Sequence, residues 1–345
     1  MKILAIETSC DETACAVTEG GPSTSSGLRI LSNIVSSSEA MHRQTGGIVP
    51  EVAAREQLKA IIPIIDKAIQ DSRFKIHDID AMAVTAGPGL VGSLLVGVET
   101  ARALAYAWGK PIIPVNHLVA HLYANFVSEI PKFPAVGLVV SGGHTDLVFM
   151  EGHRKLRLLG TTRDDAAGEC FDKCSRWLQL GYPGGPAIAA EAAKFLKRSD
   201  LVGKQQGPTL PRPMIDDDTY DFSFSGLKTA LRRFAPQGKP LQGLVAEIAH
   251  ELQEAIVEVL VKRVVRAVEE FKPKSVLLGG GVASNNRLRQ LLKSEIRNSK
   301  HETKLFIPPI ELCTDNAVMI GTAAFYNYSP IPWQKVKANP GLEIV

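Results

Sequence analysis

A strand-turn-strand pattern occurs twice in the sequence, and it restricts the fold more than any other feature. The first copy is KILAIETS followed by CDETACAV, with an acidic turn at Asp11 between them. The second copy is AVGLVVSGGHTDLVFMEG, in which a glycine turn from Ser141 to His144 separates AVGLVV from TDLVFM. Short apolar runs bounded by turn residues are typical of buried strands. The repeat therefore predicts two hairpins of the same design.

Segments with helical patterns follow each predicted hairpin. VAAREQLKAIIPIIDKAI follows the first, and DKCSRWLQL and AIAAEAAKFLKR follow the second. A strand in DIDAMAVTAGP precedes VGSLLVGVETARALAYAWG, whose small apolar residues suit a tightly packed helix. A chain of 345 residues is long enough for two domains of about 150 residues each. These features predict an α/β protein with two lobes and a duplicated core.

Composition bears on the class of protein and on its location. Apolar residues make up 45% and charged residues 22% of the chain, which is ordinary for a globular protein. The N-terminal MKILAIETSC matches neither a signal peptide nor a transit peptide, and no window approaches the ~18 apolar residues of a membrane span. We therefore expect a cytoplasmic protein. Its five cysteines form no C-x-x-C pair, which favours buried thiols.

The segment VNHLVAHLYA places His117 and His121 four residues apart in an apolar run. On a helix, such residues share one face with β-carbons about 5–6 Å apart, so both imidazoles can bind one metal ion. In the zinc-protease pattern H-E-x-x-H, a Glu beside the first His is the general base. Leu118 occupies that position here. The spacing therefore indicates a metal site but not a protease.

Three loops that contain glycine are candidates for binding a nucleotide. KSVLLGGGVASNNRLRQLL predicts a strand over 274–278, a glycine turn, and a helix capped by Ser284 or Asn285. Backbone N–H groups at such a helix start attract anions. The other two loops span 141–144 and 182–186. Each can be a simple turn, but three together favour a bound nucleotide.

Charged segments have both a structural and a functional interpretation. Residues 262–304 carry 11 Lys and Arg against 4 Glu, which suits either a solvated surface or the binding of phosphates. In ELCTDNAVMIGTAA, Thr314 or Asp315 is expected to cap a helix. In DDAAGECFDK, three carboxylates can line one helical face, either solvated or in contact with a ribose, a metal or a proton: Asp165, Glu169 and Asp172.

Ten motifs in chain order resemble the tRNA adenosine threonylcarbamoyltransferase family, once described as O-sialoglycoprotein endopeptidases. They are ETSCDETACAV, GGIVPEVAARE, TAGPGLVGSLLVG, NHLVAH, VSGGHTDLV, DDAAGECFDK, YPGGP, DFSFSGLKTA, GGGVASN and CTDNAVMIG. The resemblance runs from residue 1 to about 322. Val139 stands where archaeal and eukaryotic relatives have a tyrosine, so the chain is similar to the bacterial or organellar branch.

The resemblance implies the two-lobed, duplicated α/β fold of the actin, sugar-kinase and heat-shock-chaperone ATPase superfamily. We expect an N-terminal lobe of residues 1–112 plus about 310–345, a C-terminal lobe of residues 113–309, and a nucleotide and metal cleft between the lobes. The implied reaction transfers a threonylcarbamoyl group from threonylcarbamoyl adenylate to the exocyclic amine of the tRNA adenosine 3′ of the anticodon, and AMP is released. A paralogous subunit and a small ATPase are the implied protein partners, with no membrane.

The resemblance also assigns roles to particular residues. The family's metal ligands match His117, His121 and Asp315. Two imidazoles and one carboxylate suit Fe2+, which we expect, or Zn2+, and they leave coordination positions open for substrate. The family's substrate-binding positions match Val139, Val140, Ser141, Gly142, Gly143, Asp172, Gly185 and Asn285.

Proton transfer and tRNA contact are further expectations on the same fold. Asp11 and Glu12, in the acidic turn, are candidates to remove the proton from the attacking amine. Backbone N–H groups of the 141–143 loop are candidates to stabilise the developing oxyanion. Within the basic stretch we expect four side chains to contact tRNA phosphates: Arg287, Arg289, Lys293 and Arg297.

Two other functions remain open on the sequence. A nucleotide-dependent kinase or ATPase on the same fold would use similar glycine loops, but it needs Mg2+ and an acceptor pocket rather than a His, His, Asp set. A noncatalytic scaffold of a tRNA-modifying complex is the second alternative, and an intact ligand set argues against it.

Overall fold

The computed structural model describes residues 1–20, 28–198, 209–234 and 244–345, which divide into two compact units. Unit 1 consists of Met1–Lys132, Gly152–Lys155 and Pro308–Val345, and unit 2 consists of Phe133–Glu151 and Leu156–Ile307. Residues 113–132 were expected in the C-terminal lobe, whereas in the structure they pack within unit 1. This segment carries both histidines of interest.

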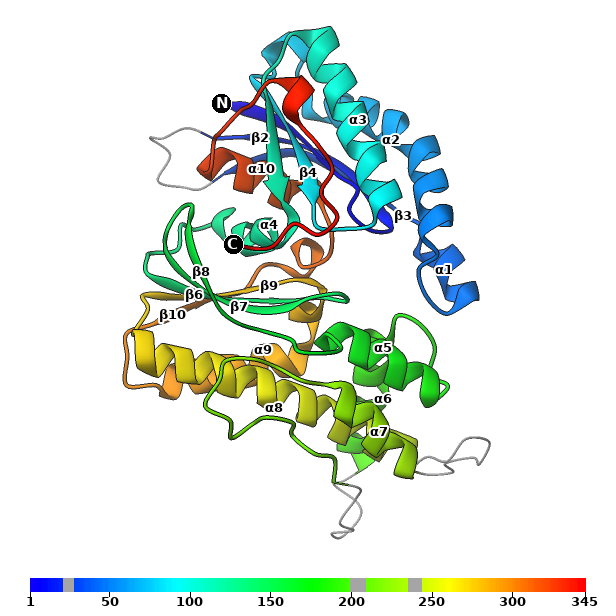
Figure 1. The fold of residues 1–345 in the computed structure, drawn as a ribbon, viewed down its shortest axis with the longest axis vertical. Coiled ribbons are helices and arrows are strands. Elements are labelled where there is room, and N and C mark those ends of the chain that lie inside the picture. The colour runs from blue at the N-terminus through cyan, green and yellow to red at the C-terminus, as the bar shows by residue number, and fades with distance from the viewer. Residues whose placement is uncertain (21–27, 199–208, 235–243) are drawn as a thin grey trace. The chain divides into compact units, whose positions relative to one another are not determined.

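Unit 1 is built on a five-stranded sheet with the order β3-β2-β1-β4-β5. Its strands are β1 (Lys2–Glu7), β2 (Glu12–Glu19), β3 (Arg29–Ser37), β4 (Ala81–Gly87) and β5 (Ile112–Asn116). The helices are α1 (Glu39–Thr45), α2 (Pro50–Ser72), α3 (Val91–Trp108), α4 (His117–Tyr123) and α10 (Ala317–Tyr326). Helices α2 and α3 pack on one face of the sheet and α10 on the other (Figure 1).

Unit 2 has a second five-stranded sheet with the order β10-β9-β6-β7-β8. Its strands are β6 (Ala135–Val140), β7 (Thr145–Gly152), β8 (Lys155–Thr161), β9 (Ser275–Gly279) and β10 (Lys304–Phe306). The helices are α5 (Ala167–Trp177), α6 (Gly184–Arg198), α7 (Ser225–Phe234), α8 (Val245–Phe271) and α9 (Asn286–Asn298). Helices α8 and α9 lie side by side beneath this sheet in Figure 1.

The predicted duplication is confirmed by the topology of the two sheets. In each unit an antiparallel hairpin, β1–β2 or β6–β7, is extended by a parallel strand, β4 or β9, beside its first strand. The two hairpin connections, 8–11 and 141–144, are both four residues long. The central strands are buried on both faces, which explains why the sequence shows them as nearly continuous apolar runs.

Four strands were not predicted: β3, β5, β8 and β10. All four lie at the edges of their sheets, and most side chains of β3, β8 and β10 are exposed or half-buried. Strand β5 is mostly buried, but it is only five residues long and its apolar run is interrupted by Pro114. An edge strand with solvent on one side needs no apolar run, so it leaves little signal in the sequence.

None of the helices in the described part of the chain could span a membrane.

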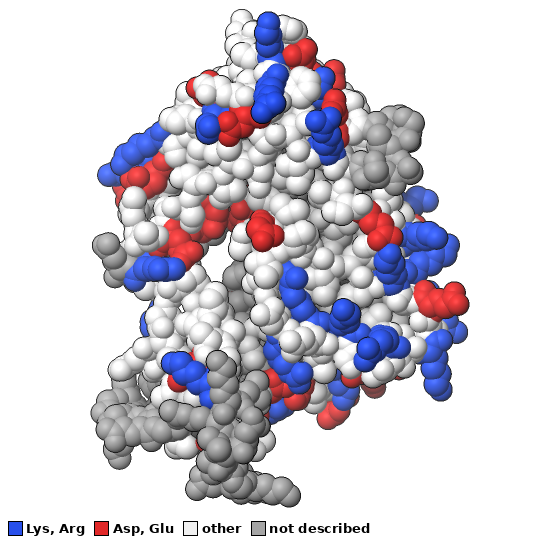
Figure 2. Space-filling model, turned by 180° about the vertical axis from the view of Figure 1, so that it is seen from behind, with Lys and Arg blue, Asp and Glu red and all other residues white. Residues whose placement is uncertain are grey.

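The basic stretch 262–304 covers the end of α8, all of α9 and β10, and Lys and Arg side chains gather over unit 2 in Figure 2. Several of these cations have partners within the protein. Arg287 makes a two-pronged ion pair with Glu254, and the Nε of Arg289 donates to the carbonyl of Ala283 at 2.6 Å. Lys293 and Arg297 are exposed on α9. Arg287 therefore has a structural partner that the expectation of a phosphate contact did not foresee.

Arg263 in the same stretch is only 2% exposed and holds the loop 214–221 against α8. Its guanidinium donates to the carbonyls of Asp221 at 3.2 Å, of Asp217 at 2.7 Å, and of Met214. A planar cation with five donors suits several carbonyls at once, which a lysine ammonium would satisfy less well. These bonds are charge-assisted and partly buried, so their loss costs more than the loss of a neutral bond at the surface.

Replacing Arg263 by Met should therefore lower the free energy of unfolding of the protein by roughly 2–4 kcal/mol. The neighbouring Lys262 pairs with Asp216 at an exposed position, so Lys262→Met should cost less than about 0.5 kcal/mol. Urea denaturation of both variants measures the difference. Equal, small shifts for the two would show that Arg263 does not hold the loop.

Candidate metal centre

The predicted histidine pair lies on a short helix that begins directly after a strand. Strand β5 ends at Asn116, whose side-chain oxygen accepts from the backbone N–H groups of Leu118 and Val119 and so caps α4. His117 and His121 are consequently one helical turn apart. They are 7% and 1% exposed, respectively. The expected helix is confirmed, and it presents both imidazoles on one buried face.

Asp315 approaches these histidines from the turn that precedes α10. Neither Thr314 nor Asp315 caps this helix, so the predicted cap was wrong. Asn316 is the cap, because its side-chain oxygen accepts from the backbone N–H of Met319 at 3.1 Å. The Asn316 amide also donates to the carbonyls of Leu312 and Thr314, which fixes the turn. The carboxylate of Asp315 is thereby directed at α4.

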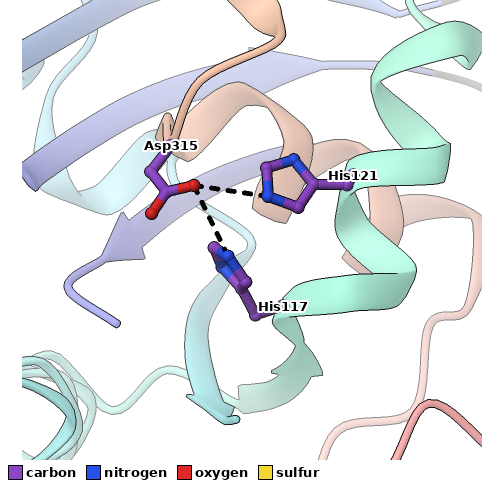
Figure 3. Close-up of side chains that lie close together, drawn as sticks. All are labelled: His117, His121 and Asp315. Carbon is purple, nitrogen blue, oxygen red and sulfur yellow. Dashed lines mark ion pairs between the residues drawn. The ribbon is translucent and has the colours of Figure 1, made fainter. Parts of the chain in front are cut away.

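The three side chains converge on one point, as Figure 3 shows. Oδ1 of Asp315 lies 3.4 Å from Nε2 of His117 and 3.3 Å from Nε2 of His121. In a tetrahedral site with ligand distances of about 2.0–2.2 Å, ligand atoms are about 3.3–3.6 Å apart. One atom from each residue lies within 4.8 Å of the other two. The donor set and its spacing therefore fit a small divalent transition-metal ion.

The protonation of the pair is consistent with a site that attracts one positive charge. Burial opposes a charge on His117, but Asp315 and Glu7 outweigh it and raise its pKa to about 9. Burial lowers the pKa of His121. Nε2 of this buried histidine faces Oδ1 of Asp315 at 3.3 Å without good hydrogen-bond geometry, and Nδ1 has no hydrogen-bond partner among the described residues. A metal ion between Nε2 and Asp315 would satisfy both of these ligand atoms.

Asp11 and Glu12 add negative charge to the same unit. Burial, together with Asp315 and Asp11, raises the pKa of Glu12 well above its usual range. Cys10 shows the same effect, since burial and the carboxylates around it raise the pKa of its thiol. Carboxylates that resist ionisation in this way indicate an excess of negative charge. A divalent cation would compensate it.

The acidic turn is held in place by side chains that the sequence analysis did not single out. The amide of Gln57, 1% exposed on α2, donates to the carbonyls of Cys10 at 3.0 Å and Glu12 at 2.9 Å. The hydroxyl of Ser93 on α3 also donates to Cys10, and that of Ser38 donates to Asp11. A buried glutamine in an amphipathic helix is the only signal in the sequence that could have identified this clamp.

The expected substrate-binding residues lie in unit 2, where β6 and β9 end side by side. Val139 and Val140 are fully buried in β6, and Val139 is paired with Gly279. Gly280, with a φ of +92°, passes so close to the carbonyl of Val140 that a β-carbon would lie 2.3 Å from its oxygen. Ligands of open α/β sheets bind at such carboxyl ends of parallel strands.

Some backbone groups of the glycine turn after β6 already form hydrogen bonds within unit 2. The N–H of Ser141 donates to the carbonyl of His144, and the carbonyl of Ser141 accepts from the N–H of Gly168 at the start of α5. Gly142 and Gly143 are exposed. Of the three loop amides proposed as oxyanion donors, that of Ser141 is therefore already bonded within the turn.

The other expected substrate-binding residues come after β6 or β9 in the chain. They are Asp172, Gly185 and Asn285. Oδ1 of Asp172 accepts from the N–H of Gly184 at 2.6 Å, which joins α5 to the start of α6. Asn285 is the cap of α9, as one of the two expected alternatives, and its amide donates to Gln253. A β-carbon on Gly185 would meet nothing within 4 Å.

The expected acidic face of DDAAGECFDK is only partly helical. Helix α5 begins at Ala167, so Asp165 precedes it and cannot share a helical face with Glu169 and Asp172. Lys173 instead joins Asp165 and Glu169 by ion pairs of 2.6 and 2.8 Å. Only Asp172 of these three carboxylates reaches the glycine-bearing segment at 184.

The chain is similar to known proteins over most of its length. The model of the family described as tRNA N6-adenosine threonylcarbamoyltransferase matches residues 29–322. A protein of that description from Moorella thermoacetica is 47% identical over 330 residues, covering 94% of this chain and 92% of its own. Another from Geobacillus thermodenitrificans is 44% identical and covers 99% and 97%, respectively.

Among solved structures, component A of (R)-2-hydroxyglutaryl-CoA dehydratase from Acidaminococcus fermentans is similar with a TM-score of 0.51 and 14% identity, covering 97% of this chain and 99% of its own. This likeness concerns the fold alone, which is a duplicated α/β fold. The function rests on the sequence relatives and on the family model, which spans most of the chain. This chain belongs to the tRNA N6-adenosine threonylcarbamoyltransferase family.

Proposed function

We propose that this protein transfers a threonylcarbamoyl group to tRNA adenosine with the help of a divalent metal ion held by His117, His121 and Asp315. The family match supports the transfer reaction. The convergence of two buried imidazoles and a carboxylate on one point supports the metal centre. We propose Fe2+ as the ion, with Zn2+ as the alternative, because nitrogen and oxygen ligands of this kind suit both.

The reaction joins the exocyclic nitrogen of the adenosine to the carbamoyl carbon of threonylcarbamoyl adenylate. The bond from that carbon to the phosphate oxygen breaks, AMP leaves with the bonding electrons, and the amine nitrogen loses a proton. A divalent ion with open coordination positions supplies Lewis-acid polarisation of the carbonyl under attack. The protein residues bind the two substrates, orient them and accept the proton.

Asp11 and Glu12 are our candidates to accept the proton of the attacking amine. Their turn is bonded to α2 through Gln57 and to α3 through Ser93. A general base must be held within hydrogen-bond reach of its proton, and a turn fixed from two helices can provide this. Both carboxylates remain candidates, because the clamp positions the backbone of each.

The carboxyl ends of β6 and β9 in unit 2 are our candidate for binding the adenylate. The exposed amides of Gly142 and Gly143 can donate to anionic oxygens of the donor. Asp172 uses Oδ1 for Gly184, and no described residue bonds its second oxygen, which suits a ribose hydroxyl. Asn285 caps the start of α9, which follows β9, and the backbone N–H groups at a helix start favour phosphate.

Exposed aliphatic residues on α2 and α3 bear on the protein partners of this chain. We propose a paralogous subunit and a small ATPase as partners in the cytoplasm, as the family resemblance implies. Four large aliphatic side chains are 46–63% exposed on α2 and α3: Leu58, Ile62, Val91 and Leu95. These helices pack closely, with Gly92 against Ala54. Exposed aliphatic residues on adjoining helices are typical of an interface, and we propose that the paralogous subunit covers them.

The metal centre predicts that the purified protein contains about one transition-metal ion, and that a His117→Ala, His121→Ala double variant contains none. Elemental analysis measures this, with His77→Ala as a control because His77 is exposed outside the site. The wild type should also modify unmodified tRNA from synthetic threonylcarbamoyl adenylate without ATP, and the double variant should not.

Each rival function gives a different result in the same assay. A requirement for ATP when the synthetic donor is supplied would favour a kinase or ATPase. Metal in the wild type without any transfer would favour a scaffold. Unchanged metal content in a folded double variant would rule out these two histidines as ligands.

The proposed role of Asp172 predicts that Asp172→Asn weakens binding of a nonreactive adenylate analogue by about 10- to 100-fold, because one acceptor becomes a donor. The variant retains an oxygen for the N–H of Gly184, so α6 should keep its start. Asp165→Asn is the control, since Asp165 pairs with Lys173. Calorimetry that gives Asp172→Asn the affinity of the wild type would contradict this assignment, and metal content should not change.

The proposed interface predicts that a Leu58→Glu, Leu95→Glu double variant no longer co-elutes with the paralogous subunit in size-exclusion chromatography, because two charges would be buried without partners. The wild type and a Leu158→Glu control, altered at an exposed position of unit 2, should co-elute with it. Co-elution of the double variant would place the interface elsewhere.

A further inference from the structure

A buried carboxylate behind the metal centre has no role in the mechanism so far. Glu7 is the last residue of β1 and is 0% exposed. Among the described residues, the ion pair that it makes is with His117. Burying a carboxylate costs several kcal/mol unless hydrogen bonds and a nearby positive charge compensate for it. Its retention at the end of a central strand therefore calls for an explanation.

The hydrogen bonds that described residues make to Glu7 hold its carboxylate toward α4. Oε1 accepts from the backbone N–H of Ser9 at 2.5 Å. Oε2 accepts from the hydroxyl of Thr85 on β4 at 2.5 Å, and it lies 3.0 Å from Nδ1 of His117. Two donors on separate segments thus orient the carboxylate, and its remaining contact is with the imidazole.

Nδ1 of His117 lies 3.0 Å from Oε2 of Glu7 and 3.1 Å from the hydroxyl oxygen of Ser9. A hydroxyl can donate or accept, whereas an ionised carboxylate only accepts, so the contact with Glu7 requires Nδ1 to be the N–H. The lone pair then belongs to Nε2, the atom that lies 3.4 Å from Asp315. His121 has no such support, because its Nδ1 has no hydrogen-bond partner among the described residues.

We propose that Glu7 is the positioning residue of the metal centre, which fixes the tautomer and ring orientation of His117 and makes its Nε2 a stronger ligand. This inference rests on the proposed metal centre and adds the residue that organises it. A carboxylate hydrogen-bonded to the distal nitrogen of a ligating histidine typically strengthens metal binding by 10- to 100-fold. Glu7 touches neither substrate nor metal in this role.

Zn2+ affinity of the metal-free protein, measured by competition with a chelator, tests the proposal. Glu7→Gln preserves the shape of the side chain but loses its charge, and it should weaken Zn2+ binding 10- to 100-fold. Thr85→Val is the matched control, because it removes another hydrogen bond to the same oxygen while the carboxylate stays on His117. It should change the affinity by less than about threefold, well below the loss expected on removing the carboxylate.

A second measurement needs no variant at position 7, should Glu7→Gln fail to fold. In the Zn2+-loaded wild type, nitrogen-15 NMR of the histidine rings should show His117 protonated at Nδ1, with this proton far downfield in a strong hydrogen bond. The signal is assigned by its loss in His117→Gln. Metal on Nδ1 of His117, or wild-type affinity in a folded Glu7→Gln protein, would overturn the role of Glu7. Absence of Zn2+ binding by the wild type would overturn the metal centre itself, and Glu7 with it.

Discussion

The surplus of buried and half-buried negative charge in unit 1 is the constraint on which its site depends. Glu7, Asp11 and Glu12 come from the first hairpin, and Asp315 comes from the turn before α10. The charged groups that raise the pKa of Glu12 are carboxylates, and the ion pairs of Asp315 are with the histidines of α4. Uncompensated charge of this kind is too costly to persist. The raised pKa of His117, to about 9, shows how the protein compensates when a proton is the available cation.

Helix caps decide which polar side chains become ligands. At both helix starts the capping role falls to an asparagine next to the ligand, Asn116 before His117 and Asn316 after Asp315. An asparagine side chain satisfies the first backbone N–H groups of a helix as well as an aspartate does. The adjacent histidine and aspartate are thus directed to the proposed metal position while the helix starts remain satisfied. The cap predicted at residues 314–315 was wrong because Asn316 caps α10 and the Asp315 side chain points at α4 instead.

Duplication of one sheet provides two equivalent hairpin connections with different chemistry. In unit 1 the connection after the first strand carries carboxylates, and in unit 2 the equivalent connection carries glycines. Carboxylates suit a metal ion and proton transfer, whereas glycine amides suit the oxygens of a phosphate or a carbonyl. A single architecture can therefore serve both halves of the proposed reaction, because the fold fixes where a connection lies and the sequence of that connection sets what it can bind.

The sequence by itself determined the duplicated hairpins, the central strands, most helices and the spacing of the histidine pair, because these depend on local periodicity and on turn residues. The resemblance of its motifs indicated Asp315 as a ligand, which spacing alone had left as a probable cap. Only the tertiary structure decided that Asn316 caps α10, that Asp165 lies outside α5, and that Arg287 and Arg263 are bonded within the protein. It also brought Glu7 to His117, 110 positions further along the chain. Such contacts join segments whose pairing depends on strand order, and strand order leaves no local pattern in a sequence.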